Sequence, residues 1–288
     1  MSFSNAAKLK AAVKKIAAEL GVAAQGVLQK YVLERFLCRL AKSDYHGNFI
    51  LKGGFLTSSL VGVAKRTTMD IDATATGFNV DQVSLKEILL SICSENLQDG
   101  FTFSFDRIED ICEKDAYPGL RAYMQASFAP MTIPFYVDVT VGDAITPKPV
   151  LQLFWSMFDD GDYELLAYNL ETLLAEKLDT MLSRGVLNTR SRDFYDVDLL
   201  WNRYRKTIDR DVLARALRNT MTSRKNLKLL DKFERVMGEV KSDDRMKQRW
   251  ESYQKEYAFA AEKTFSEVCD SALDVLRAAV LLPLSEQA

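Results

Sequence analysis

The period of the apolar residues changes in the middle of the chain, and this change most constrains the fold. In the first half, three segments alternate apolar and polar residues with the period of two that is typical of strands, namely residues 101–108, 120–128 and 133–141. After Pro147 and Pro149 the apolar residues recur every three or four positions, as in helices, over residues 170–183, 192–204, 211–220, 226–240 and most of 250–281. The pattern predicts a mixed α/β half, an α-helical half, and a boundary near residues 145–165.

Shorter elements precede the three alternating strands. Their apolar spacing and glycine stops predict helices over residues 5–19, 29–42, 55–63 and 81–93. Two short strands are expected at 49–51 and 68–74. We therefore expect three parts: N-terminal helices over 1–48, an α/β core over 49–155, and a helical C-terminal domain over 156–288.

Several classes of protein are excluded by the residues that the chain lacks. His46 is the only histidine, so sites built on two or more histidines are excluded. The four cysteines, Cys38, Cys93, Cys112 and Cys269, are far apart, which predicts reduced, structural thiols in a cytoplasmic protein. No apolar run approaches the roughly 20 residues that a bilayer span needs. Any chemistry must use carboxylates, lysine, arginine and hydroxyls.

Three carboxylates are placed on predicted strands. Asp70 and Asp72 lie two residues apart, so they share one face about 6.6 Å apart along the strand. Asp138 is the one acid inside the strand expected at 133–141. If these strands are neighbours, the three acids would converge and either take up protons or bind a cation. Oxygen ligands favour Mg²⁺ or Mn²⁺. The alternative is that these are ordinary solvent-facing acids, which is common for an isolated Asp-x-Asp pair.

A glycine turn and an inward lysine add to this pattern. Lys52-Gly53-Gly54 lies between a predicted strand and helix, where backbone N–H groups can bind an anion or simply form a tight turn. Lys177 falls on the apolar stripe of helix 170–183. Its partner could be a nucleotide phosphate or an acid of a neighbouring helix, unless it extends to solvent. Asp193 and Asp196, three residues apart, share a face and could hold Lys177 or a ribose.

The net charge of −2 hides a strong segregation. Residues 190–249 carry 17 Lys and Arg against 10 Asp and Glu, a net charge of +7, which leaves −9 for the rest of the chain. A basic helical half beside an acidic half suits a ligand with a phosphate backbone, although solvated helix faces explain such a segment almost as well. Tyr195, Trp201 and Tyr204 could stack an unpaired base or belong to the core.

Five ordered blocks within residues 29–205 resemble one family. They are residues 31–45, 49–54 (Phe-Ile-Leu-Lys-Gly-Gly), 66–72 (Arg-Thr-Thr-Met-Asp-Ile-Asp), 171–177 (Glu-Thr-Leu-Leu-Ala-Glu-Lys) and 190–196 (Arg-Ser-Arg-Asp-Phe-Tyr-Asp). In this order and spacing they are similar to the AbiEii-type nucleotidyltransferase toxins, which include the MenT toxins.

The resemblance implies a DNA polymerase β-like nucleotidyltransferase core with a mixed sheet and a helical C-terminal domain. It implies that Gly53 and Gly54, with Lys52, Thr57 and Arg66 nearby, bind the triphosphate of an NTP. Asp70, Asp72 and Asp138 would hold Mg²⁺ or Mn²⁺ for two-metal catalysis. The essential lysine of the family maps to Lys177, and its following aspartate to Asp193 or Asp196, beside Arg192.

The family implies a toxin that transfers nucleotides to RNA, in some members to the 3′ end of tRNA. A cognate antitoxin opposes such toxins, and some systems serve in phage defence by abortive infection. One departure is Phe55, which stands where nucleotidyltransferases often have a phosphate-binding serine, so that Thr57 or Ser58 would have to substitute. The alternatives are a nucleotidyltransferase for a small molecule such as an antibiotic, and an inactive scaffold that binds a protein partner.

Overall fold

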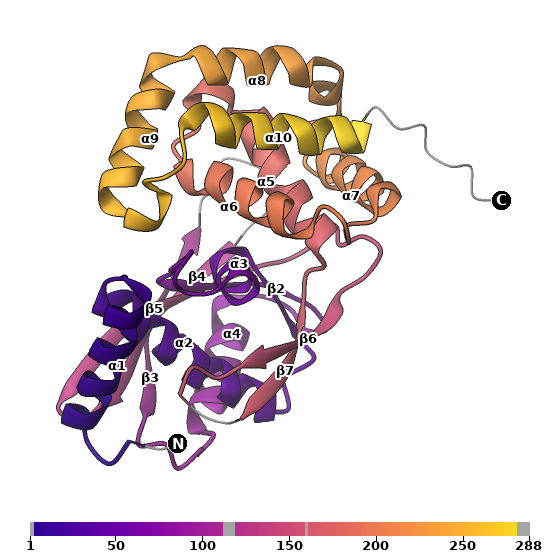
Figure 1. Cartoon of the computed structure of the whole chain (residues 1–288). Helices are drawn as coiled ribbons and strands as arrows, with labels where there is room; N and C mark the ends of the chain where they lie inside the picture. The colour runs from indigo at the N-terminus through magenta and orange to yellow at the C-terminus, as the bar shows by residue number, and fades with distance from the viewer. Residues whose placement is uncertain (1–2, 112–118, 159–160, 281–288) are drawn as a thin grey trace. The chain divides into compact units, whose positions relative to one another are not determined.

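A seven-stranded mixed sheet forms the centre of the first half of the chain in this computed structural model (Figure 1). The structure describes residues 3–111, 119–158 and 161–280. The strand order is β3-β4-β5-β2-β1-β7-β6. The strands are β1 (Phe49–Lys52), β2 (Asp70–Ala75), β3 (Thr102–Ile111), β4 (Gly119–Phe128), β5 (Met131–Thr140), β6 (Val150–Trp155) and β7 (Asp162–Ala167).

The sheet combines parallel and antiparallel strand pairs. β2 pairs parallel with β5 and antiparallel with β1, while β1 pairs parallel with β7. The antiparallel meander β3–β4–β5 forms one side of the sheet, and the hairpin β6–β7 forms the other. The mixed α/β fold class predicted from the sequence is confirmed.

Four helices belong to the same compact unit as the sheet: α1 (Ala6–Leu20), α2 (Ala24–Lys42), α3 (Gly53–Val61) and α4 (Gln82–Ser94). α2 packs on one face of the sheet, where the ring of Phe36 lies 5.6 Å from that of Phe103 and 5.2 Å from that of Phe135. α4 packs against β3 and is capped by Asp81, whose carboxylate accepts hydrogen bonds from two N–H groups of its first turn. The alternation of β3–β5 thus buries one face under helices and leaves the other open to solvent.

The second compact unit is helical and comprises residues 143–149 and 168–288. Its α-helices are α5 (Leu170–Arg184), α6 (Ser191–Tyr204), α7 (Arg210–Ser223), α8 (Phe233–Ser242), α9 (Asp244–Glu256) and α10 (Phe265–Val280). Residues 143–149 join it because the Thr146 N–H donates to Thr172 Oγ1 at 3.0 Å, and Asn169 Nδ2 donates to the Thr146 carbonyl at 2.8 Å. The chain therefore passes between the units at 142/143, 149/150 and 167/168.

Several boundaries differ from the sequence-based expectations. β6 and β7 were not predicted, because Val150–Trp155 is nearly all apolar and Asp162–Ala167 has no clear period of two. They occupy the region 145–165 in which the boundary was expected. The expected helix 226–240 is a 3₁₀ turn (Leu227–Lys232) followed by α8, and the expected helix 250–281 is divided between α9 and α10, with residue 281 outside the described residues.

The cysteines that the structure describes serve packing. Cys38, Cys93 and Cys269 carry reduced thiols, and Cys112 lies outside the described residues. Burial raises the pKa of Cys93 to about 11 and that of Cys269 to about 12, so both stay protonated at neutral pH. Among the described residues, no helix combines the length and the apolar character needed to cross a membrane.

A buried ion pair fixes α2 to the chain that precedes β3. Arg39, only 1% exposed, donates to both carboxylate oxygens of Asp99 at 2.8 and 2.9 Å. The same guanidinium donates to the carbonyls of Arg35 and Phe101. Its donors thus satisfy four oxygens that would otherwise lose their hydration on burial.

We expect Arg39→Met to lower the free energy of unfolding by about 3–5 kcal/mol, because it leaves the Asp99 carboxylate buried without its partner. Urea denaturation followed by circular dichroism measures this loss. The matched control is Lys15→Met, which removes an exposed partner of Glu19 and should cost at most about 0.5 kcal/mol. Equal losses in the two variants would contradict the structural role of the buried pair.

Candidate active site

Four charged residues form one row across the middle of the sheet. Lys52 in β1 is the register partner of Asp72 in β2, Asp72 that of Asp138 in β5, and Asp138 that of Arg121 in β4. Direct register partners project from the same face of a sheet. The parallel pairing of β2 with β5 therefore places the acids predicted from the sequence side by side.

Asp70, Asp72 and Asp138 converge at this point. Each offers a carboxylate oxygen within 4.8 Å of those of the other two, and all three side chains are half-buried. The Thr68 hydroxyl donates to Asp70 Oδ1 at 2.6 Å. Three acids this close repel one another unless cationic groups compensate their charge. The all-oxygen donor set fits Mg²⁺ or Mn²⁺.

Arg121 compensates part of this charge. Its Nε and Nη2 atoms donate to the two oxygens of Asp138 at 2.7 and 2.6 Å, a bidentate pair. These hydrogen bonds to Asp138 raise the pKa of the guanidinium further above its ordinary value. Sequence reasoning missed Arg121, although the alternation in β4 places it on the open face; only the strand register identifies its partner.

The glycine turn at the start of α3 lies against the acids. Gly53 has φ +61°, and a Cβ there would overlap the Asp72 carboxylate. The Gly54 N–H donates to Asp72 Oδ2 at 3.2 Å, and a Cβ on Gly54 would press on the Thr68 hydroxyl. Both glycines are therefore required for the close approach of helix and strand. The turn brings the N-terminus of α3, which attracts anions, to the carboxylates.

The other residues expected around the turn have internal partners. Lys52 is buried and its ammonium donates to Thr140 Oγ1 at 2.7 Å. Thr57 is fully buried and donates to the Gly53 carbonyl at 2.9 Å, and Ser58 donates to the Arg66 carbonyl at 2.6 Å. Phe55, which stands where a phosphate-binding serine is common, is itself buried in the core. Arg66 is buried next to Gly54 and donates to the Thr67 carbonyl.

Lys177 has acidic partners within the helical unit. Its ammonium lies 2.7 Å from Asp196 Oδ2 and 3.2 Å from Asp193 Oδ1, and all three residues are buried. Of the partners considered from the sequence, the structure therefore shows the acids of a neighbouring helix, α6. Arg192, on the same helix, is exposed.

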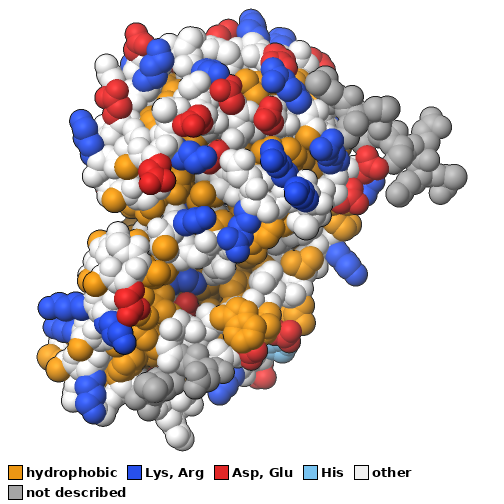
Figure 2. All heavy atoms as spheres, viewed as in Figure 1, with side chains coloured by type: hydrophobic (Ala, Val, Ile, Leu, Met, Phe, Trp, Pro, Cys, Tyr) orange, Lys and Arg blue, Asp and Glu red, His pale blue; other side chains and the backbone are white. Residues whose placement is uncertain are grey.

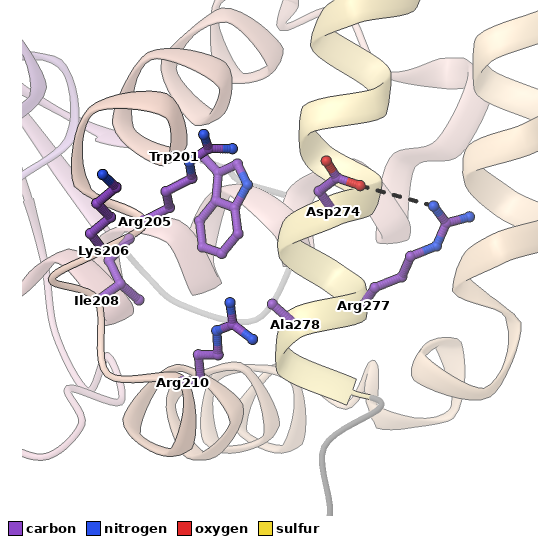
Figure 3. Close-up of a pocket in the computed structure, with 8 residues that line it drawn as sticks. All are labelled: Trp201, Arg205, Lys206, Ile208, Arg210, Asp274, Arg277 and Ala278. Carbon is purple, nitrogen blue, oxygen red and sulfur yellow. Dashed lines mark ion pairs between the residues drawn. The ribbon is translucent and has the colours of Figure 1, made fainter.

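A basic pocket lies on the helical unit (Figure 3). Its volume is about 930 Å³, and four cations and one acid line it together with Trp201: Arg205, Lys206, Arg210, Arg277 and Asp274. Lys and Arg side chains also gather on the visible face of this unit in Figure 2. Trp201 is 6% exposed, whereas Tyr195 is enclosed by the rings of Trp250, Tyr253 and Phe259 and belongs to the core.

Comparison with known proteins gives one family match and several structural likenesses. The family model described as "Nucleotidyl transferase AbiEii toxin, Type IV TA system" matches residues 35–275. No curated protein matches the chain.

The solved structures that resemble the chain do so at low identity. A Helicobacter pylori protein described as a nucleotidyltransferase shares 16% identity with a TM-score of 0.48, covering 90% of this chain and 97% of that one. JHP933, also from Helicobacter pylori, shares 14% identity with a TM-score of 0.49, covering 89% and 94%. An antigenic nucleotidyltransferase-like protein from Paracoccidioides brasiliensis shares 14% identity with a TM-score of 0.40, covering 69% and 90%.

We expect Asp72→Asn to weaken Mn²⁺ binding at least tenfold, because removal even of an outer-shell partner of a metal commonly costs 10- to 100-fold. Titration followed by electron paramagnetic resonance measures free Mn²⁺ without any substrate. Asp44→Asn, a change of an exposed acid outside the site, is the matched control and should leave Mn²⁺ affinity unchanged. Equal affinity in wild type and Asp72→Asn would refute the metal site.

Replacement of Lys177 separates a structural role from a chemical one. We expect Lys177→Met to lower the free energy of unfolding by about 3–5 kcal/mol, because two buried carboxylates lose their cation. The double variant Lys177→Met/Asp196→Asn, which removes the closer acid, should regain part of this stability but not nucleotidyl transfer. Transfer that returned together with stability would assign Lys177 a purely structural role.

Proposed function

Because the chain belongs to the AbiEii nucleotidyl transferase toxin family, we propose that it transfers nucleotides from an NTP to RNA, and specifically to the 3′ end of tRNA. The observation that supports this chemistry best is the convergence of Asp70, Asp72 and Asp138 beside the Gly53–Gly54 turn. A carboxylate cluster next to a helix N-terminus provides for both a divalent cation and a phosphate.

In the proposed reaction, the 3′ hydroxyl oxygen of the acceptor forms a bond to the α-phosphorus of the NTP. The bond from that phosphorus to the oxygen bridging to the β-phosphate breaks, and pyrophosphate leaves. Divalent ions held by Asp70, Asp72 and Asp138 would supply charge neutralisation and in-line alignment. The N–H groups of the glycine turn would bind the triphosphate.

Asp138 is the proposed acceptor of the hydroxyl proton. Both of its oxygens accept hydrogen bonds from Arg121, so this role requires the guanidinium to release at least one of them. An anionic triphosphate offers Arg121 an alternative partner, because phosphate oxygens also accept two parallel hydrogen bonds from a guanidinium. We retain Lys177, Arg192, Asp193 and Asp196 as proposed contributors to nucleotide binding, and we leave out Thr57, whose buried hydroxyl is bonded to the Gly53 carbonyl.

The basic pocket favours RNA over a small acceptor. Arg205, Lys206 and Arg210 form no ion pair with any residue that the structure describes, in contrast to Arg235, Arg245 and Lys247 later in the basic segment. Unpaired cations beside a tryptophan edge can bind a phosphate backbone. The small-molecule nucleotidyltransferase remains the second candidate, since the carboxylate site by itself specifies no acceptor.

The family assignment also suggests the biological context. We propose that transfer to tRNA arrests growth in the cytoplasm, that a cognate antitoxin opposes it, and that the pair serves in phage defence by abortive infection. The inactive scaffold bound to a protein partner is disfavoured by the intact Asp70, Asp72 and Asp138 cluster.

The expected outcome with purified protein, total tRNA, Mg²⁺ and each labelled NTP in turn is label incorporated at the tRNA 3′ end. Asp72→Asn should abolish it and also relieve growth arrest on induced expression, whereas Asp44→Asn should do neither. Undiminished labelling by Asp72→Asn, or arrest without labelling by any NTP, would refute the mechanism.

The salt dependence of the same assay distinguishes RNA from a small acceptor. Each phosphate contact to single-stranded nucleic acid contributes about −0.7 to the slope of log affinity against log salt. The double variant Arg205→Ala/Arg210→Ala should therefore reduce that slope by about 1.4, and Arg235→Ala should leave it unchanged. A slope of zero in the wild-type protein would favour the small acceptor.

A further inference from the structure

The open face of β3–β5 carries a second row of side chains next to the carboxylates. Arg107 is the register partner of Tyr123, Tyr123 that of Tyr136, and Tyr136 that of Asp70. The row thus runs across three strands and ends at the metal-site acid. Glu109 and Arg121 lie in the adjacent row, the one that contains Asp138. We call Arg107, Glu109, Arg121, Tyr123 and Tyr136 the sheet platform.

Contacts among the platform side chains fix their positions. The Arg107 guanidinium lies 3.5 Å from the centroid of the Tyr123 ring, and its Nε donates to Glu109 at 2.9 Å. The Tyr123 hydroxyl donates to the second oxygen of Glu109 at 2.6 Å. These three groups close a ring of contacts that fixes the guanidinium plane over the phenol.

The contacts continue toward the carboxylates. The Tyr123 and Tyr136 rings meet edge to face, with centroids 5.0 Å apart. Arg121 lies 5.3 Å from the Tyr136 centroid while it binds Asp138. A continuous path of planar groups therefore leads from the sheet edge to the metal-site acids.

This surface is accessible although it is ordered. The side chains of Arg107 and Glu109 are each 51% exposed, that of Arg121 is 37% exposed, and both tyrosines are half-buried. The neighbouring residues on the opposite face, Ala122, Met124 and Val137, are buried in the core. A planar guanidinium that is held in place yet exposed is suited to stacking against a flat ligand.

We propose that the sheet platform binds the unpaired 3′ end of the acceptor RNA, with bases stacked on Arg107 and the two tyrosines and the terminal hydroxyl directed to Asp70 and Asp138. This inference rests on the proposed function and adds its acceptor subsite. Aromatic rings and guanidinium planes are the groups on which single-stranded nucleic acids stack.

The dimensions agree with a short single strand. Strands lie about 4.8 Å apart, so the three steps from β3 to β2 span roughly 14 Å. At about 3.4 Å per stacked nucleotide, this distance accommodates about four nucleotides. An RNA with an unpaired 3′ end of that length fits the platform, whereas a blunt duplex presents no free bases to it.

The test measures binding of a fluorescent single-stranded RNA octamer to the full chain by anisotropy, without NTP. Arg107→Ala should weaken binding about tenfold, the effect of losing one stacked base, about 1.4 kcal/mol. Arg107→Lys keeps the charge but not the plane, and should remain within about threefold of Arg107→Ala. Lys14→Ala, which removes an exposed cation of α1, is the control and should not change the affinity.

Three results would overturn the platform: unchanged octamer affinity in Arg107→Ala, full affinity in Arg107→Lys, or an equal loss of affinity for a blunt duplex. In the transfer assay, Arg107→Ala should raise the KM for the acceptor and leave the KM for the NTP unchanged. A rise confined to the NTP would assign the platform to the incoming nucleotide and refute its acceptor role.

These outcomes are separable from failure of the proposed function. If the wild-type chain labels tRNA while Arg107→Ala binds and labels RNA normally, the platform is wrong and the function stands. If the wild-type chain labels no RNA with any NTP, but Arg107→Ala binds the octamer more weakly than the wild-type chain does, the platform binds RNA and the proposed reaction is wrong. Thermal unfolding of each variant confirms that it is folded.

Discussion

Electrostatic repulsion among Asp70, Asp72 and Asp138 is the constraint on which the rest of the site depends. Three carboxylates within 4.8 Å of one another are stable only where other groups balance their charge. The protein balances it from three sides: a guanidinium from β4, a hydroxyl from Thr68 and a backbone N–H from the start of α3. This explains the central position of β2, since a strand with antiparallel β1 on one side and parallel β5 on the other brings these groups together. The absence of a side chain at Gly53 completes the arrangement, because no other residue leaves room for the Asp72 carboxylate.

Periodicity predicted the parts of the site that are local in the sequence. The shared face of Asp70 and Asp72, the outward position of Asp138 and the glycine turn all follow from residues close together in the chain. Pairing between distant strands does not, which is why Arg121 was missed although it binds Asp138 through both oxygens. The hydrogen bond from the Thr57 hydroxyl to the Gly53 carbonyl was not foreseen for a related reason, since only the folded helix brings the two groups together. β6 escaped detection because this edge strand is nearly all apolar even where it is exposed, as at Leu151 and Trp155, so no alternation marks it. β7 has only six residues, too few for a clear period in the sequence.

Lys177 illustrates that an inward charge needs partners of opposite charge within the fold. From the sequence, a phosphate, a carboxylate or extension to solvent was open for this lysine, and the helical unit provides two carboxylates from α6. The ammonium compensates carboxylates that would be costly to bury alone. The same reasoning separates Arg224, which is bound among Asp143, Glu176 and Asp179, from the cations around Trp201, which face solvent. The net charge of a segment therefore says less about ligand binding than which of its charged side chains already have ion-pair partners.

The path of the chain between the two compact units limits how this protein can diversify. Residues 143–149 belong to the helical unit, yet the next strands, β6 and β7, return to the sheet before the chain enters α5. Neither unit is thus a contiguous stretch that recombination could transplant whole. A cut at either side of the hairpin would remove β7 from β1 and expose a new sheet edge. In such an architecture we expect new acceptor preferences to arise by substitutions on existing surfaces rather than by exchange of a whole domain.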